Sequence, residues 1–334
     1  MKYYLIAGER SGDLHGSNLI KQLKFKDSRA EFCGFGGDEM ESAGMKISQH
    51  YSSMAFMGFL EVIKNLGTVK RLLNKCKRDI LSYQPDVVIL IDYGGFNMKI
   101  SKFCKRNSVC NFYYISPKVW AWNTKRALKL KRTVDQMFVI LPFEVEFFKK
   151  FDWQVDYVGN PVLDAVKSHS ADVKENTDYV ALLPGSRPQE LENSLPILKK
   201  VVKALKHVNF SLAAVDNVEE SLYEDIKSLA NVTLIKGHTY DLLASAKAAV
   251  VTSGTATLET ALWKIPQVVT YATSSISYVI AKSLIKVDYI SLVNLITNKP
   301  VVKELIQNEF TAKNVILELD SLLNDANYRN DMKI

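Results

Sequence analysis

The chain has 334 residues, which is long for one hydrophobic core and favours two domains of about 150 residues each. Hydrophobic residues make up 47% and charged residues 24%, a globular composition that excludes a disordered or fibrous chain. Four cysteines without a C-x-x-C pair argue against a disulfide framework or a zinc ribbon. No apolar run approaches the roughly 18 residues of a membrane span. The N-terminus does not read as a secretory signal, so we expect a cytoplasmic protein.

The net charge of +7 is concentrated in the first half of the chain. Residues 1–160 carry 25 Lys and Arg against 16 Asp and Glu, with basic clusters at 64–78, 99–106 and 118–132. Such a surface suits a nucleic acid, an anionic membrane or an anionic substrate, or it is simply a solvated face. The sequence contains no helix-turn-helix, zinc-finger or RNP pattern, which argues against nucleic acid.

Short apolar runs rich in Val, Ile and Tyr predict strands at residues 3–7, 87–92, 111–115, 136–141, 179–183, 210–214, 233–236, 248–252 and 267–270. Helical spacing lies between them, at 17–24, 68–83, 193–206 and 257–263. This alternation predicts an α/β protein with parallel sheets covered by helices on both faces. We expect two Rossmann-like doubly wound domains facing a cleft, 1–160 and 161–334, the second ending in a polar tail. Ligands of such sheets bind at the carboxyl ends of the strands.

Two loops of the first domain are candidates for chemistry. The segment GERSGD at 8–13 follows the first strand and matches neither a dinucleotide nor an ATP loop, so it is a structural turn or a substrate loop. Asp92 ends the apolar strand VVILID, where a carboxylate is placed to act as a general base. A turn-forming aspartate before glycines is the alternative.

The first strand–loop–helix of the second domain suits a phosphate. In the segment LPGSR, Ser186 with Gln189 three residues on resembles a capping box. The free N–H groups of the helix start, the bare backbone of Gly185 and the fork of Arg187 are suitable donors to an anion. A plain capped helix is the other interpretation.

The segment SGTATLE at 253–259 repeats this strand–turn–helix pattern. Its hydroxyls and amides suit phosphate oxygens, and Glu259 could accept from the hydroxyls of a ribose. The two loops together favour a nucleotide diphosphate. The sequence contains no Asp-x-Asp pair, and its five histidines lack metal-ligand spacing, so we expect no metal and no other cofactor.

The apolar segment at 54–63 is either core or, beside the basic stretch 64–78, a surface that lies on an anionic membrane. The segment PKVWAW at 117–122 places two tryptophans next to basic residues, an interfacial combination of the same kind. His15, in the first loop, is a candidate for substrate contact.

Nine segments, taken in order, resemble the bacterial lipid-A-disaccharide synthase family: GERSGDLHG, MGFLEV, IDYGGFN, YYISPKVWAW, LPFE, YVGNPVLD, LLPGSR, SGTATLE and DYISLVNLI. The resemblance runs from residue 3 to about 307. It implies a metal-independent, inverting glycosyltransferase of the two-Rossmann-domain type. Such an enzyme transfers 2,3-diacylglucosamine from its UDP derivative to 2,3-diacylglucosamine 1-phosphate, forming a β-1′,6 bond and releasing UDP.

The resemblance also implies roles for individual residues. Asp92 matches the essential aspartate, Asn294 an active-site asparagine, and Glu9 and Ser11 line the cleft. The UDP and diphosphate site would comprise Gly185, Ser186, Arg187, Ser253, Gly254, Thr255 and Glu259. Leu60, Val62, Ile63 and Leu66 match an apolar patch that receives acyl chains.

The partners implied are the two lipid substrates and the inner-membrane surface, with peripheral attachment, no nucleic acid and a possible homodimer. The first domain would face the acceptor and the membrane, and the second would bind the UDP-sugar. The alternative that we retain is a soluble UDP-N-acetylglucosamine transferase or epimerase of the same fold.

Overall fold

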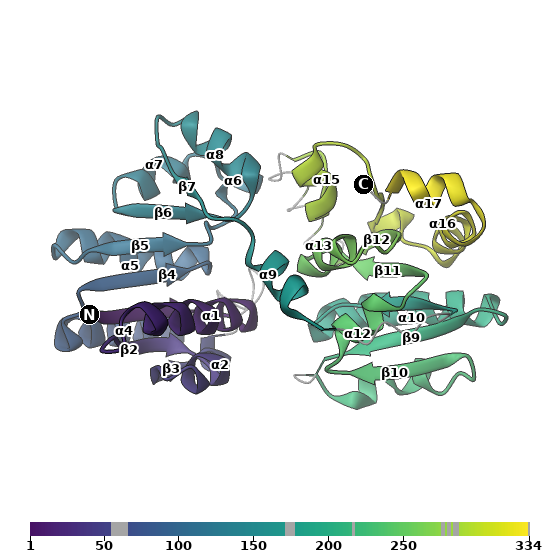
Figure 1. Ribbon diagram of the computed structural model, residues 1–334, viewed down its shortest axis with the longest axis horizontal. Coiled ribbons are helices and arrows are strands. Elements are labelled where there is room, and N and C mark those ends of the chain that lie inside the picture. The colour runs from purple at the N-terminus through teal and green to yellow at the C-terminus, as the bar shows by residue number, and fades with distance from the viewer. Residues whose placement is uncertain are drawn as a thin grey trace. The chain divides into compact units, whose positions relative to one another are not determined.

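The structure is a computed structural model that describes residues 1–54, 66–170, 178–215, 218–274, 278, 282 and 287–332. The chain divides into two compact units, Met1–Gly159 and Asn160–Ile334, and each is described by itself. Both are α/β units in which helices alternate with the strands of a parallel sheet (Figure 1). The predicted fold class, two doubly wound Rossmann-like units, is confirmed.

The first unit has a seven-stranded sheet of order β3-β2-β1-β4-β5-β6-β7, in which every pairing is parallel. The strands are β1 (Lys2–Ala7), β2 (Glu31–Gly36), β3 (Lys46–His50), β4 (Val87–Ile91), β5 (Asn111–Tyr114), β6 (Gln136–Val139) and β7 (Asp156–Tyr157). The helices are α1 (Arg10–Lys26), α2 (Asp38–Ser42), α4 (Leu66–Tyr83), α5 (Gly94–Arg106), α6 (Val119–Trp122), α7 (Arg126–Lys131) and α8 (Pro142–Lys149), with a 3₁₀ turn at Tyr51–Met54.

The second unit has a six-stranded parallel sheet of order β10-β9-β8-β11-β12-β13. The strands are β8 (Tyr179–Leu183), β9 (Asn209–Ala214), β10 (Val232–Lys236), β11 (Ala248–Thr252), β12 (Gln267–Tyr271) and β13 (Lys303–Ile306). The helices are α9 (Pro161–Ser168), α10 (Pro188–Ala204), α11 (Glu224–Lys227), α12 (Thr239–Ala244), α13 (Thr255–Leu262), α15 (Leu292–Thr297), α16 (Ala312–Asn324) and α17 (Ala326–Met332), with 3₁₀ turns at Glu220–Tyr223 and Gln307–Glu309.

Alternate residues of the central strands enter two separate cores, one on each face of the sheet. In β1, Tyr4 and Ile6 join one cluster, whereas Leu5 and Ala7 join the other. Strands β4, β8 and β11 divide their side chains in the same way. Because both faces are covered, these strands are apolar throughout rather than alternating with polar residues, which is why the sequence marked them clearly.

Four strands were not predicted: β2, β3, β7 and β13. Strand β2 contains glycine, and Gly34 has φ of +148°, with its Cα so close to β1 that a Cβ would lie 2.0 Å from the Leu5 carbonyl oxygen. Strands β3, β7 and β13 are edge or near-edge strands with polar residues, so they lack the apolar run of a central strand. The predicted polar tail is largely helical, since α17 packs against α16.

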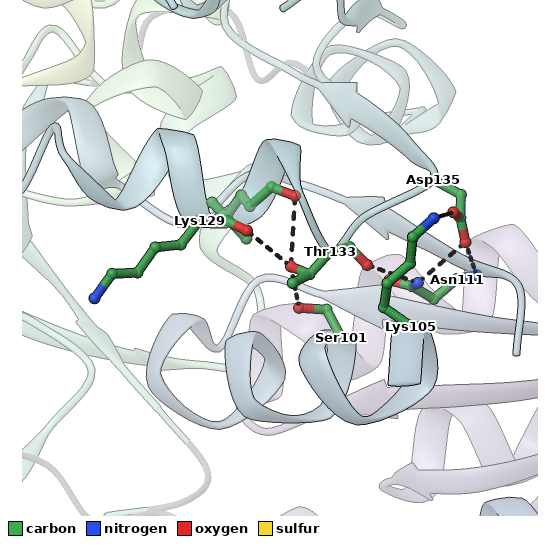
Figure 2. Close-up of polar contacts among 7 residues, drawn as sticks. Ser101, Lys105, Asn111, Lys129, Thr133 and Asp135 are labelled. Carbon is green, nitrogen blue, oxygen red and sulfur yellow. Dashed lines mark hydrogen bonds and ion pairs between the residues drawn. The ribbon is translucent and has the colours of Figure 1, made fainter. Parts of the chain in front are cut away.

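A polar network closes the amino-terminal edge of the first sheet beside β5 and β6 (Figure 2). The carboxylate of Asp135 accepts from Lys105 Nζ at 2.8 Å and from the Asn111 backbone N–H at 3.0 Å. Asn111 Nδ2 also donates to the Thr133 carbonyl, and the Thr133 hydroxyl lies 3.0 Å from Ser101 Oγ. The network joins helix α5 to the entrances of two strands, so this edge serves the fold.

Asp13, in the first turn of α1, holds helix α2 in place. Its Oδ1 accepts from the backbone N–H of Gly37 at 2.7 Å and of Met40 at 3.2 Å, and its Oδ2 from that of Glu39 at 3.1 Å. The side chain is buried. This aspartate, part of the GERSGD segment, therefore satisfies the amino end of a neighbouring helix.

We expect Asp13→Asn to lower the free energy of unfolding by about 2 kcal/mol, because an amide replaces part of an acceptor that serves three N–H groups, two of them in buried hydrogen bonds. Urea denaturation followed by circular dichroism measures the change. The matched control is Asp38→Asn, since the Asp38 side chain is 89% exposed. Equal losses for the two variants would contradict the capping role.

Candidate functional site

The candidate residues of the first unit lie where the strand order reverses. Strand β1 leads towards β2 on one side, whereas the neighbouring β4 leads towards β5 on the other. Ala7 and Ile91 pair at the carboxyl ends of β1 and β4, so the loops that carry Glu9 and Asp92 diverge from adjacent points. This is the position at which open parallel sheets form a ligand crevice.

The backbone at Asp92 turns sharply and is held by hydrogen bonds from two buried side chains. Asp92 and Tyr93 have φ of +42° and +45°, a left-handed conformation that is uncommon for residues with a Cβ. The Asp92 carbonyl accepts from the hydroxyl of Tyr113 at 2.6 Å and from Nδ2 of Asn97 at 3.0 Å. Both donor residues are buried, so the position of the Asp92 backbone is fixed by the core.

Burial raises the pKa of the Asp92 carboxyl to about 6, with the nearby carboxylates of Glu9 and Glu144 adding to the rise. The ammonium of Lys118 and the backbone N–H of Tyr93 act in the opposite direction. At pH 7 the group is mostly ionised yet more basic than an exposed aspartate. These are the properties that a general base for a hydroxyl proton requires.

Glu144 joins the two loops beside Asp92. Its Oε1 accepts from the hydroxyl of Ser116 and, at 3.2 Å, from Nε1 of Trp120, while its Oε2 accepts from the backbone N–H of Ile140 and Leu141. The Trp120 indole is buried and packs edge-on to a phenylalanine of α8. The interpretation of Trp120 as a membrane-interface residue is therefore wrong: it anchors the loop that carries Lys118.

The other candidates of the first unit lie on α1. Glu9 is its N-cap residue and Ser11 is exposed in its first turn. His15 lies within the helix rather than in a loop, and burial lowers its pKa to about 4, so its imidazole is neutral at pH 7.

The second unit repeats the arrangement at its own reversal of strand order. Strands β8 and β11 are neighbours in the sheet, with β9 beyond one and β12 beyond the other. Leu183 and Val251 pair near their carboxyl ends, so the LPGSR and SGTATLE loops leave from adjacent points. The two loops predicted to form one nucleotide site are thus adjacent within one unit.

The LPGSR loop ends in a cap that differs from the predicted capping box of Ser186 and Gln189. The N-cap residue of α10 is Arg187, and Glu190 reaches back instead. Glu190 Oε2 accepts from the Ser186 N–H at 2.9 Å, and Oε1 lies 3.1 Å from Nη1 of Arg187. Gly185 has φ of +125°, which disfavours any side chain there.

In the SGTATLE loop, Gly254 and Thr255 are exposed at the start of α13, as a ligand site requires. Ser253 Oγ donates to the carbonyl of Ile290 at 3.0 Å, which ties this loop to the DYISLVNLI segment. Glu259 Oε1 accepts from the hydroxyl of Tyr240 at 3.0 Å, and burial raises the pKa of the Glu259 carboxyl.

Asn294 lies in a buried network of the DYISLVNLI segment. Its Nδ2 donates to the Val302 carbonyl and to Glu304 Oε1, each at 2.9 Å, and its Oδ1 accepts from the Val302 N–H at 2.9 Å. Its side chain is 1% exposed. The amide is therefore engaged within the loop in this conformation, and a catalytic role for Asn294 stays a prediction.

Three of the four residues of the expected acyl patch, Leu60, Val62 and Ile63, lie outside the described residues, as does most of the 54–63 segment. Leu66 begins α4 and is 56% exposed. Among the described residues there is no group of three potential metal ligands. Over the same residues, no helix has the length and apolar character needed to cross a membrane.

A family model described as lipid-A-disaccharide synthetase matches residues 3–333. The chain belongs to the lipid-A-disaccharide synthase family. Similar relatives named lipid-A-disaccharide synthase include those of Syntrophus aciditrophicus, 38% identical over 97% of this chain and 89% of that protein, and Geobacter metallireducens, 37% identical over 96% and 87%. The sequence resemblance is confirmed, and the chain is a glycosyltransferase of lipid A biosynthesis.

Solved structures of low sequence identity share the fold. The UDP-GlcNAc 2-epimerase from Neisseria meningitidis, solved bound to UDP-GlcNAc, has a TM-score of 0.67 at 14% identity, with 100% of this chain and 94% of that chain covered. The glycotransferase of kitacinnamycin has a TM-score of 0.68 at 12% identity, with 99% and 92% covered. This chain thus shares its fold with these two structures.

Sequence reasoning missed Glu144, Glu190 and Tyr240, each of which contacts a predicted site residue or its loop. Glu190 alone carried a readable signal, since an acidic residue in the first turn of a predicted helix is a common partner for the N–H groups of the cap. The side-chain partners of Glu144, Trp120 and Ser116, are 24 and 28 residues distant, so only the fold brings them together.

We expect Asp92→Asn to raise the free energy of unfolding by about 1–3 kcal/mol at pH 7.5. The folded carboxyl keeps its proton up to about pH 6, whereas an unfolded aspartate loses it near pH 4, so burying the charge costs stability above pH 6. The gain should vanish below pH 4. Urea midpoints at the two pH values measure it, with Glu146→Gln, a 72% exposed side chain, as control. A less stable variant at pH 7.5 would refute the assigned burial cost.

Proposed function

We propose that this protein transfers an acylated glucosamine from its UDP derivative to a second acylated glucosamine that carries a 1-phosphate. The products are a β-1′,6-linked disaccharide and UDP, formed by one inverting displacement. Membership of the lipid-A-disaccharide synthase family supports the reaction, and the paired loops of the second unit support a nucleotide donor.

The observation that carries the proposal is Asp92, a carboxylate with a raised pKa at the reversal point of the first sheet. Asp92 would take the proton of the acceptor 6-hydroxyl while that oxygen attacks the anomeric carbon. The bond from that carbon to the diphosphate breaks as the new bond forms, and its electron pair leaves with UDP. Glu9 and Ser11, at the start of α1, would line the acceptor side.

The charge that develops on UDP needs donors fixed in advance. Arg187 is the N-cap residue of α10, a helix of 17 residues. Its guanidinium and the backbone N–H groups after Gly185 lie at the amino end of this helix, which favours an anion. The adjacent SGTATLE loop would contact the same diphosphate through Ser253, Gly254 and Thr255. Glu259, oriented by the Tyr240 hydroxyl, would accept from the ribose.

We infer that these donors replace a metal ion, because a guanidinium and helix N–H groups can stabilise the leaving diphosphate without one. The absence of an Asp-x-Asp pair from the sequence supports this. We expect the rate of disaccharide formation to be unchanged when a chelator is added, and a loss of turnover would contradict the inference.

We propose that helix α4 contacts an anionic membrane peripherally. Its first residue, Leu66, is exposed, and Lys70 and Arg71 are exposed one turn later on the same helix. An apolar side chain beside basic ones suits the boundary between acyl chains and phosphates. Leu60, Val62 and Ile63, the other residues of the expected acyl patch, precede this helix in the sequence, which supports the same surface as the place where acyl chains enter.

The epimerase alternative is not favoured. The relatives that are 34–38% identical over nearly the whole chain are named lipid-A-disaccharide synthase, whereas the epimerase structures are 12–14% identical and share the fold alone.

We expect Asp92→Asn to retain UDP binding and to lose turnover by at least about 100-fold, the usual contribution of a general base. In the wild-type protein, the rate should fall about tenfold per pH unit below pH 6, as the Asp92 carboxyl becomes protonated. Disaccharide formation from the two lipid monosaccharides measures both. Retained turnover, or a rate that stays flat down to pH 5, would remove Asp92 as the base.

We expect the double variant Lys70→Glu, Arg71→Glu to lose most of its binding to vesicles that contain an anionic phospholipid, since each basic residue contributes about 1 kcal/mol near such a surface. Co-sedimentation measures the bound fraction. The control Lys149→Glu, Lys150→Glu makes the same charge change at exposed positions of and beside α8. Equal losses in the two variants would argue for net charge rather than for helix α4.

A further inference from the structure

The donors assigned to the diphosphate already hold an anion, the carboxylate of Glu190. One oxygen accepts from the Ser186 N–H at 2.9 Å, and the other pairs with the Arg187 guanidinium at 3.1 Å. The Glu190 side chain is 18% exposed, whereas the Arg187 side chain is 43% exposed. The carboxylate therefore lies deeper in the loop than the cation that it pairs with.

Gly185 makes room for this arrangement. A Cβ at Gly185 would lie 2.6 Å from the Glu190 Cβ and 2.7 Å from Oε2. The carboxylate is thus packed directly against the loop backbone, in the space that a side chain at 185 would fill. A phosphate that approaches the same backbone would meet Glu190 there.

A carboxylate and a phosphate compete for these donors, because the single hydrogen of the Ser186 N–H serves one oxyanion at a time. Both are oxyanions that the amino end of a helix and a guanidinium stabilise in the same way. Placed side by side, they would also repel each other. Binding of a diphosphate at this backbone therefore requires the Glu190 side chain to leave the Ser186 N–H, and charge repulsion favours its departure from the Arg187 guanidinium as well.

We propose that Glu190 is an internal competitor for the diphosphate subsite, which a nucleotide diphosphate must displace. The inference rests on the proposed function, because it takes the LPGSR loop as the diphosphate site. Glu190 is then a specificity-determining residue. A ligand that offers only a phosphate gains little by replacing one oxyanion with another, whereas a nucleotide also gains contacts at the ribose and the base.

The same competition would assist release of the product. When UDP departs, the carboxylate re-forms its two bonds, so the donors are not left unpaired in the empty site. Weakening the carboxylate should therefore strengthen product inhibition by UDP as well as binding.

Isothermal titration with UDP tests the proposal on the full-length chain. Glu190→Gln keeps the shape of the side chain and removes its charge, and Glu190→Ala removes the acceptor. The matched control is Glu192→Gln, which makes the same charge change at an exposed position two residues on in α10. Thermal melting verifies that each variant is folded, and Arg187→Ala reports separately on the diphosphate site.

We expect both Glu190 variants to bind UDP more tightly, by on the order of tenfold, which is the scale of one charged hydrogen bond. Glu192→Gln should bind as the wild type does. If the wild type binds UDP and Arg187→Ala weakens it, while neither Glu190 variant tightens it, the competitor role is refuted and Glu190 only caps α10. If Arg187→Ala leaves UDP affinity unchanged, or the wild type does not bind UDP, the assigned diphosphate site fails and the competitor role fails with it.

Discussion

Each unit is organised by the burial of an all-parallel sheet on both faces. Because helices cover the two faces, the central strands carry apolar side chains throughout, and polar groups gather where the chain leaves the strands. At the carboxyl ends of the strands of each sheet, neighbouring loops diverge where the strand order reverses. Asp92 lies there in the first unit and Arg187 in the second, whereas the opposite edge of the first sheet is closed by the contacts of Asp135.

How completely the side chains of a strand are buried decided whether the strand could be predicted from the sequence. Strands β4 and β11 were predicted to within a residue because every side chain in them is buried. Strand β2 was not predicted because it contains Gly34, and glycine is typical of loops. The close approach of the Leu5 carbonyl in the neighbouring strand requires a glycine at this position. That reason lies in a contact between strands 29 residues apart, and no local pattern encodes it. Strand β13 was missed for a different reason: it lies at a sheet edge and contains exposed and partly exposed polar residues, so it lacks an apolar run.

Within the site, the sequence indicated residues that end strands and begin helices, since their position follows from topology. The sequence could not indicate which hydrogen-bond partners these side chains have in the folded protein. Asn294 was expected at a substrate, but the amide is enclosed by the loop that it holds together. Trp120 was expected at a membrane, but it is held by Glu144. Glu190 occupies donors that the sequence left for a phosphate. Each difference depends on a contact with a partner that the sequence does not specify.

The loop at Asp92 combines two costs, a partly buried carboxylate with a raised pKa and two successive left-handed residues, Asp92 and Tyr93. Each left-handed residue of this kind costs on the order of 1–3 kcal/mol, which the hydrogen bonds from Tyr113 and Asn97 help to offset. Directed evolution for heat resistance alone would therefore enrich replacements at position 92, asparagine or glycine above all, whereas the ring of Tyr93 packs against the core and its hydroxyl donates to the Met54 carbonyl. Thermotolerant libraries of this protein need a catalytic counter-screen, because their most robust members would be expected to include inert ones.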